Sequence, residues 1–410
     1  MLTNKLLSII LFSLSLTCRE ECAAKLKIVR SPESPSPVVI VPGDGGSQFK
    51  AKLNKPNVKH YFCDKKTNSY FTLWLNLEQM IPYILECWVD NMRLVYNNVT
   101  RTTSNSPGVD IIIPGFGETS TIEYIDPSRA KISSYFYEIV NILTATANYT
   151  RGVNVRGAPY DFRKAPNELK EYYERLKQLI EETYKINKNL RILMICHSLG
   201  CPITLYFLNN QTLAWKDKYI KALVTLAAPW GGAVKALKAF ASGDNLGVSL
   251  LDSLTVRGEE RTNPSTAFLL PSNQFWKQDE VLSYTPVSNY TVSNYYKFFQ
   301  DLKYQTGWDM WLDTHKLIHN LESPGVEIHC LYGTGLQTIS QFYYKDMDSF
   351  PNSYPELEYG DGDGTVNVRS LRGCLRWTNI FYREYKSIDH MKILQHPPVL
   401  DYIRNLAVGN

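Results

Sequence analysis

The chain has 410 residues, of which 44% are hydrophobic and 20% are charged, and its formal net charge is +4. This composition is typical of a globular protein with enough apolar residues for a large core. The small net charge, with no basic run of five or more residues, argues against a nucleic-acid-binding protein.

The N-terminus predicts a cleaved signal peptide, residues 1–24. Lys5 precedes an apolar stretch, residues 6–17, that is too short to span a bilayer, and small residues follow at Ala23 and Ala24. A buried N-terminal helix is the alternative, which the charged residues at 19–21 disfavour. No later apolar run reaches the length of a membrane span, so we do not expect an integral membrane protein.

Two further features fit a secretory protein. Four N-glycosylation sequons begin at Asn98, Asn148, Asn210 and Asn289. Cysteines in such a protein can pair, and we expect two disulfides, Cys63–Cys87 and Cys330–Cys374. We expect the cysteines at positions 196 and 201 to be free thiols.

Buried strands alternate with helices along the chain. Helical periodicity covers 166–185, and a second helix begins near 201. Short segments that are mostly apolar predict strands at 38–41, 109–113, 190–195, 222–226 and 326–332. This alternation predicts an α/β fold with a mostly parallel sheet and helices on both faces.

Two segments interrupt this alternation. Residues 56–105 form a separate subdomain around the expected Cys63–Cys87 bridge. Residues 233–325, rich in Tyr, Asn and Ser, are expected to form an inserted cap with a mobile lid at about 241–265. The core is then assigned to 36–55, 106–232 and 326–410.

Ser198 lies in the sequence Cys-His-Ser-Leu-Gly, residues 196–200, between an expected strand and an expected helix. A strand, then x-x-Ser-x-Gly, then a helix is the context of a nucleophile elbow. Taken alone, the motif fits an ordinary strand–helix turn equally well.

The rest of the chain offers an acid and a base in the order that this fold class uses. Asp363 lies in a Gly/Asp cluster after the strand at 326–332, and His390 follows a strand-like segment near the C-terminus. His396 precedes two prolines, where helix capping is the simpler explanation. A surface turn and a surface loop histidine are the alternatives for Asp363 and His390.

Acyl-transfer chemistry gives these residues distinct roles. A serine hydroxyl needs a base to take its proton, here His390, and an acid to orient that base, here Asp363. An oxyanion hole needs two backbone N–H groups, which Leu199 and the glycine-rich loop at 43–46 can supply. A plain glycine-rich turn is the alternative for that loop.

With these motifs the chain resembles the lecithin:cholesterol acyltransferase family of α/β-hydrolases. The resemblance covers nearly all of the mature chain, in the stretches 39–47, 69–77, 86–91, 156–163, 214–220, 228–232, 297–301, 329–335 and 362–367. The chain departs from the family's usual pattern at Cys196, where Ala or Gly is usual, at the loop 43–47, and at Phe162, where Trp is usual.

The resemblance implies roles for particular residues. It implies the triad Ser198, Asp363 and His390, an oxyanion hole from the amides of Asp44 and Leu199, and the two disulfides given above. It also implies that 56–105 is a membrane-binding subdomain. The residues that would enter lipid are Leu73, Trp74, Leu75 and Ile81, and core packing is the alternative for this stripe.

The resemblance also implies an activity. We expect a monomeric glycoprotein, lysosomal or secreted, that docks on phospholipid membranes and acts as a phospholipase A1/A2. The acyl group of an acyl-Ser198 intermediate would pass to water or to a lipid alcohol such as ceramide. The nearest alternative is a secreted phosphatidylcholine-sterol O-acyltransferase. A neutral-lipid lipase and a catalytically inactive lipid-binding protein are more distant alternatives.

No metal or other cofactor is expected. The sequence has no His-Glu-x-x-His motif, and the Gly/Asp cluster at 360–364 lacks the distal Glu of an EF-hand.

Overall fold

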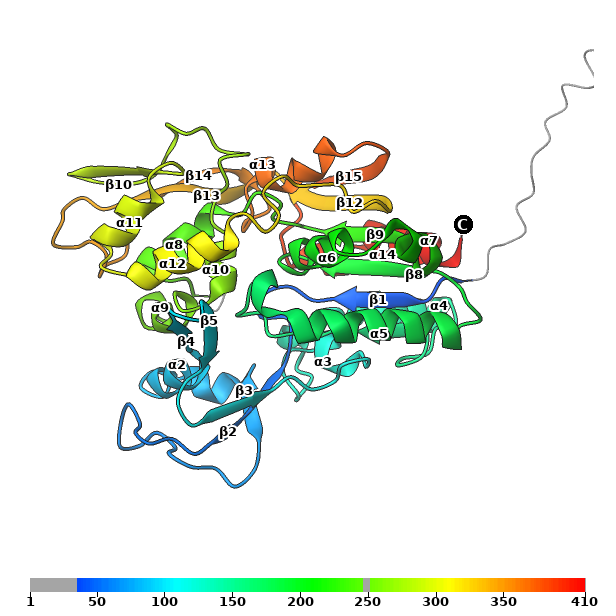
Figure 1. Ribbon diagram of the computed structural model, residues 1–410, viewed down its shortest axis with the longest axis horizontal. Coiled ribbons are helices and arrows are strands. Elements are labelled where there is room, and N and C mark those ends of the chain that lie inside the picture. The colour runs from blue at the N-terminus through cyan, green and yellow to red at the C-terminus, as the bar shows by residue number, and fades with distance from the viewer. Residues whose placement is uncertain (1–34, 246–250, 410) are drawn as a thin grey trace, which may run out of the picture.

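A computed structural model describes residues 35–245 and 251–409 of the chain (Figure 1). The expected signal peptide, residues 1–24, and the middle of the expected lid, residues 246–250, lie outside the described residues.

The centre of the fold is a six-stranded sheet in which all neighbouring strands are parallel. The strands in spatial order are β15 (Ile380–Lys386), β12 (Glu327–Thr334), β9 (Ile220–Leu226), β8 (Ile192–His197), β1 (Val38–Val41) and β7 (Val155–Gly157). Every residue of β1 and β8 is buried, because both faces of the sheet are covered. The predicted parallel α/β sheet is confirmed.

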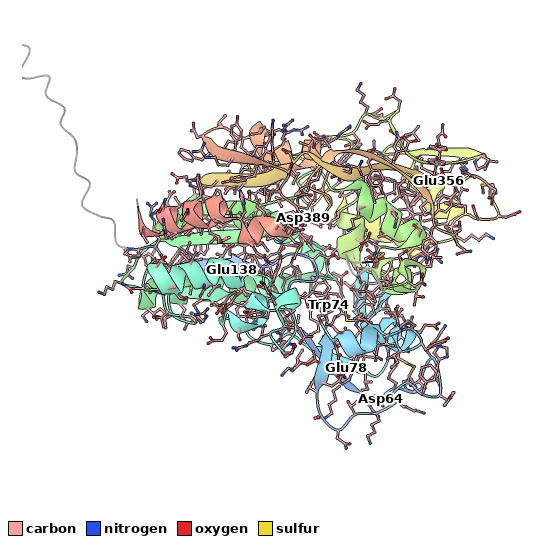
Figure 2. All side chains as sticks on the ribbon, turned by 180° about the vertical axis from the view of Figure 1, so that it is seen from behind. Asp64, Trp74, Glu78, Glu138, Glu356 and Asp389 are labelled. Carbon is pink, nitrogen blue, oxygen red and sulfur yellow. A yellow bond between two sulfur atoms is a disulfide. The ribbon has the colours of Figure 1, made fainter. Side chains whose placement is uncertain are left out.

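Helices cover both faces of this sheet. Figure 1 shows α5 (Lys170–Ile186), α6 (Gly200–Asn209) and α7 (Leu213–Tyr219) on the near face. Figure 2, from behind, shows α4 (Tyr137–Thr146) and α14 (Pro397–Val408) on the other face. The predicted helix at 166–185 is thus confirmed as α5, which buries its apolar stripe against the core. Among the described residues, no helix combines the length and apolarity needed to cross a membrane.

A small subdomain lies beside the core, at the carboxyl ends of the parallel strands (Figure 1). Its three-stranded sheet has the order β3 (Phe71–Trp74), β2 (Phe49–Leu53) and β6 (Val109–Ile112), and β4 (Leu94–Asn97) pairs with β5 (Thr102–Asn105). Cys63 is bonded to Cys87 of α2 (Leu85–Met92). The strand predicted at 109–113 therefore belongs to this small sheet and not to the central one, and it exposes alternate residues.

The segment expected to form the cap contributes most of a second hydrophobic core. Its helices are α8 (Val234–Ser242), α9 (Ser253–Glu260), α10 (Pro264–Phe268), α11 (Tyr295–Asp301) and α12 (Gln305–Thr314). Its four-stranded sheet has the order β11 (Ser288–Thr291), β10 (Val281–Thr285), β13 (Leu336–Tyr343) and β14 (Glu356–Gly362). Residues 336–362 thus join the cap sheet, although the sequence assigned them to the core.

The second expected disulfide, Cys330–Cys374, joins β12 to the segment that follows α13 (Val368–Leu371). The four sequon asparagines, Asn98, Asn148, Asn210 and Asn289, are all exposed at the surface.

Candidate active site

Ser198 occupies a sharp turn between the end of β8 and the start of α6. Its φ is +51°, in the left-handed region that a non-glycine residue rarely adopts, and its amide donates to Leu226 O of β9 over 2.9 Å. The turn is tight because glycines face it. A Cβ on Gly200 would lie 2.3 Å from Pro42 O, and one on Gly43 would lie 2.8 Å from the Cβ of Ser198. The backbone therefore holds the Ser198 hydroxyl at the carboxyl end of the sheet.

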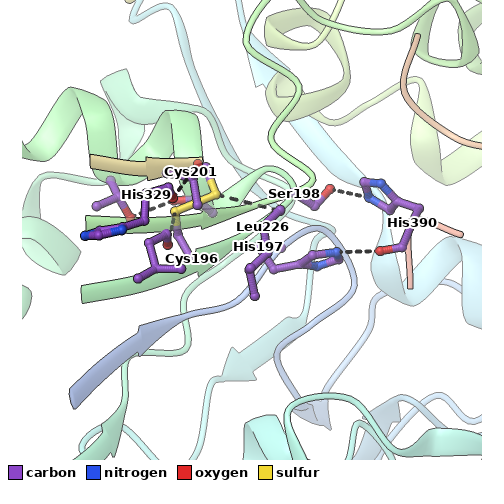
Figure 3. The surroundings of a disulfide bond; sticks show 12 residues. Cys196, His197, Ser198, Cys201, Leu226, His329 and His390 are labelled. Carbon is purple, nitrogen blue, oxygen red and sulfur yellow. Dashed lines mark hydrogen bonds between the residues drawn. A yellow bond between two sulfur atoms is a disulfide. The ribbon is translucent and has the colours of Figure 1, made fainter. Parts of the chain in front are cut away.

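The structure brings Ser198, His390 and Asp363 together. Ser198 Oγ lies 2.9 Å from His390 Nε2 (Figure 3), and His390 Nδ1 lies 2.7 Å from Asp363 Oδ2. A carboxylate can only accept, so Nδ1 carries the proton and Nε2 accepts from the serine hydroxyl. This is the hydrogen-bond order of a serine nucleophile, its base and the acid that orients the base.

Asp363 is held by backbone groups. Its other oxygen, Oδ1, accepts from the amides of Val366, at 2.7 Å, and Thr365, at 3.0 Å. The amide of His390 in turn donates to the carbonyl oxygen of Asp363 over 2.9 Å. These contacts fix both the carboxylate and the backbone of the histidine that it orients.

The loop after β1 forms a turn beside Ser198. Gly46 N donates to Gly43 O over 3.1 Å, and the indole N–H of Trp74 donates to Gly45 O over 2.7 Å. Asp44 lies in the middle of this turn, and Leu199 is the N-cap of α6. The hydrogen bond that closes the turn does not use the amide of Asp44, and the first hydrogen bonds of α6 do not use the amide of Leu199. Both amides can therefore donate to an oxyanion.

The expected lipid contact of three residues is wrong in this structure. Leu73 is fully buried, and Trp74 and Leu75 are 6% exposed, because β3 packs against β2 and under the loop after β1. Core packing, the alternative for this stripe, holds for these three. Ile81, the fourth residue, is 53% exposed.

The sequence led us to expect free thiols at Cys196 and Cys201, and this prediction is wrong. The structure joins them by a disulfide whose Cα atoms are 5.0 Å apart (Figure 3). The bond links the end of β8 to the first turn of α6, across the turn that holds Ser198. Two cysteines that flank a serine in a secretory chain were a signal for this pair, but the bent path that closes the distance was not visible in the sequence.

Two buried acids lie at the end of α9, within the described part of the expected lid. Burial raises the pKa of Glu259 to about 7, with a smaller contribution from Asp44, and Glu259 accepts from the Asn263 amide over 2.8 Å. Burial, aided by Asp244, raises the pKa of Glu260 well above its usual range. Both carboxyls therefore favour the protonated form in acid.

A parallel sheet with a serine on the strand–helix turn, followed by an aspartate and a histidine, defines the α/β-hydrolase class of enzymes. Residues 70–397 match the sequence profile of the Lecithin:cholesterol acyltransferase family. The chain belongs to that family.

Curated relatives cover most of the chain. The chain is 48% identical over 377 residues to the rat protein named lysosomal phospholipase A and acyltransferase, covering 91% of this chain and 90% of the relative. The human protein of that name is 46% identical over 393 residues, 94% of each chain. A chicken phosphatidylcholine-sterol acyltransferase is 42% identical over 375 residues, 89% of each.

The raised pKa of Glu259 makes stability depend on pH. The pKa of Glu259 is about 7 in the folded protein, which is higher than in the unfolded chain. The contribution of Glu259 to the free energy of unfolding is therefore fully present below the unfolded pKa and is lost as pH rises through about 7. Glu259→Gln keeps the neutral form at every pH. We expect wild type and variant to unfold at similar temperatures near pH 4.5, and the variant to be more stable by several degrees at pH 8.

Thermal unfolding followed by circular dichroism between pH 4.5 and 8 measures this difference. Glu171→Gln, on the exposed surface of α5, is the matched control and should leave the pH dependence as it is. Parallel curves for wild type and Glu259→Gln would contradict the prediction.

The Cys196–Cys201 disulfide predicts a stability effect that is separable from catalysis. The chain-entropy model gives about 2 kcal/mol for a loop this short, so the Cys196→Ala/Cys201→Ala double variant should unfold at a lower temperature. Because neither cysteine belongs to the proposed triad or supplies a proposed oxyanion amide, we expect the folded variant to keep its reaction with serine-directed probes.

Non-reducing peptide mass spectrometry and thermal unfolding test this prediction together. The Cys330→Ala/Cys374→Ala variant is the control for losing a disulfide far from Ser198 in sequence. Recovery of Cys196 and Cys201 as two alkylated thiols from the unreduced wild-type protein would refute the Cys196–Cys201 disulfide.

Proposed function

We propose that this protein is a serine phospholipase A that releases fatty acid from glycerophospholipids and also transfers the acyl group to a lipid alcohol such as ceramide. The observation that carries the proposal is the 2.9 Å contact of Ser198 Oγ with His390 Nε2, with Asp363 on the other side of the imidazole. The names of relatives that match about nine-tenths of the chain support the substrate class.

The reaction proceeds in two halves. His390 takes the Ser198 proton as the hydroxyl oxygen attacks the acyl carbonyl, and the amides of Asp44 and Leu199 stabilise the oxyanion that forms. The tetrahedral intermediate collapses as the bond from its carbon to the lysophospholipid oxygen breaks, and His390 gives the proton to that oxygen, so that the lysophospholipid leaves as an alcohol. Water or a lipid hydroxyl then attacks acyl-Ser198 in the same way, giving a fatty acid or a new ester and restoring the serine.

We further propose that the subdomain at 56–105 docks on a phospholipid surface. It carries exposed apolar side chains, which we name the subdomain patch: Tyr61, Phe62, Leu77, Ile81, Tyr83 and Ile84. Figure 2 shows this lobe apart from the core, with Glu78 and Asp64 on it and Trp74 at its junction. Amphipathic aromatic and aliphatic side chains of this kind favour the membrane interface.

The alternative is a secreted phosphatidylcholine-sterol acyltransferase, which the chicken relative supports at lower identity. Both activities use the same acyl-Ser198 step and differ in the acceptor hydroxyl. The signal-peptide pattern and four exposed sequons support passage through the secretory pathway as a glycoprotein, ending in the lysosome or outside the cell, where the protein acts as a monomer.

Substitution of Ser198 tests the proposed activity directly. Ser198→Ala removes the nucleophile, so we expect acyl release from phosphatidylcholine to fall by about 10⁴-fold or more. Liposomes of phosphatidylcholine with a short-chain ceramide, at acidic and neutral pH, provide substrate and acceptor, and mass spectrometry separates fatty acid from acyl-ceramide. Both products should require Ser198.

Two outcomes would reject the proposal. Liposome binding without any Ser198-dependent product would reject the proposal that this protein is an enzyme. Product that forms only when a sterol and an apolipoprotein are supplied would favour the sterol acyltransferase.

The subdomain patch predicts a separation of binding from chemistry. Ile81→Ser/Tyr83→Ser removes exposed apolar surface, so we expect at least a tenfold loss of liposome hydrolysis and of vesicle co-sedimentation. Hydrolysis of a soluble short-chain ester should stay unchanged. Leu213→Ser on α7, which is 65% exposed, is the control for an exposed apolar residue on the core. An equal loss on the soluble ester would contradict docking by this patch.

A further inference from the structure

His197 lies next to the proposed nucleophile but outside the proposed triad. It is 1% exposed, and both ring nitrogens have partners. Nδ1 lies 2.6 Å from the hydroxyl oxygen of Tyr135, and Nε2 lies 3.0 Å from the backbone oxygen of His390 (Figure 3). The imidazole thus spans the space between Tyr135 and the proposed catalytic base.

The partners fix where each proton sits. The backbone oxygen of His390 can only accept, so Nε2 of His197 carries a proton and donates it. In the neutral ring Nδ1 is then an acceptor, and it takes the hydroxyl proton of Tyr135. Burial lowers the pKa of His197 well below its usual range, with a further contribution from His390, which favours this neutral ring.

Tyr135 extends the chain of hydrogen bonds to the proposed oxyanion loop. Its hydroxyl oxygen accepts from the amide of Gly43 over 2.9 Å, and its side chain is buried. Gly43 precedes Asp44, whose amide is a proposed oxyanion donor. These three hydrogen bonds form a chain that we call the bridge. It runs from the Gly43 amide through Tyr135 and His197 to the His390 carbonyl, with a donor and an acceptor matched at each step.

We propose that Tyr135 and His197 are positioning residues that hold the oxyanion loop and the catalytic base at a fixed separation on either side of Ser198. The proposal rests on the proposed function, since it takes Ser198 and His390 as the reacting pair. Neither Tyr135 nor His197 contacts the triad side chains through a hydrogen bond. They act through the backbones of Gly43 and His390, where displacements of about 1 Å can cost two orders of magnitude in rate.

Two substitutions of His197, by Gln and by Asn, each remove one of its two hydrogen bonds and keep the other. The amide nitrogen of Gln can replace Nε2, so His197→Gln keeps the bond to His390 and loses the one from Tyr135. The amide oxygen of Asn can replace Nδ1, so His197→Asn keeps the bond from Tyr135 and loses the one to His390. Tyr135→Phe removes the same central bond as His197→Gln and also the bond from Gly43.

We expect each variant to lower kcat on a soluble short-chain ester by about tenfold or more, with KM changed less than twofold. Because Tyr135→Phe and His197→Gln break one shared contact, the double variant should lose less than the product of the single losses. Tyr149→Phe is the matched control. Tyr149 is also buried, and its hydroxyl donates to Ser36 O over 2.5 Å, away from Ser198, so kcat should be unchanged.

The rate of Ser198 labelling by a fluorophosphonate separates this inference from the proposed function, because labelling needs the activated serine but no lipid. Slower labelling of folded Tyr135→Phe and His197→Gln would support the bridge even if no lipid product formed. Wild-type labelling rates and kcat in both variants would overturn it. A kcat loss that only follows the unfolded fraction, measured by thermal unfolding and matched by Tyr149→Phe, would also overturn it.

Discussion

The site depends on one constraint, the left-handed backbone of Ser198 at the end of β8. A non-glycine residue holds φ = +51° only when the surroundings force it to. Here α6 and the loop after β1 close on the turn at Gly200 and Gly43, where a side chain would overlap Pro42 O or the Cβ of Ser198. This close approach aims the hydroxyl out of the sheet and places the amides of Leu199 and the loop beside it.

The other parts of the site reach Ser198 because strands end at one edge. His390 follows β15, and Asp363 follows β14, whose return along β13 brings the chain back beside the end of β12. The amide of His390 bonds to the carbonyl of Asp363, so base and acid are tied through the backbone as well as through their side chains. Carboxylate, imidazole and hydroxyl are therefore placed by residues that follow the ends of β14, β15 and β8.

The sequence predicted what local pattern encodes. Residues 38–41 and 192–195 are continuous apolar runs, which suit parallel strands covered on both faces, and the strands predicted at 38–41 and 190–195 were confirmed as β1 and β8. The segment at 109–113 has a similar composition but joins the small sheet, because its partner lies on β2. Trp74 shows that apolar character alone does not separate lipid contact from core packing. The Tyr135–His197 contact joins residues 62 positions apart, and no local pattern marks such a pair.

Burial of His197 favours the reaction proposed for its neighbour His390. Their ring centroids are 4.9 Å apart, and the reaction places a positive charge on His390 when it takes the Ser198 proton. If His197 were also charged, repulsion at that distance would be about 3 kcal/mol at an effective dielectric constant of 20, or roughly two orders of magnitude in rate. Burial holds the pKa of His197 well below its usual range, which favours the neutral ring. The imidazole beside the nucleophile can then donate to His390 without opposing the charge that catalysis creates.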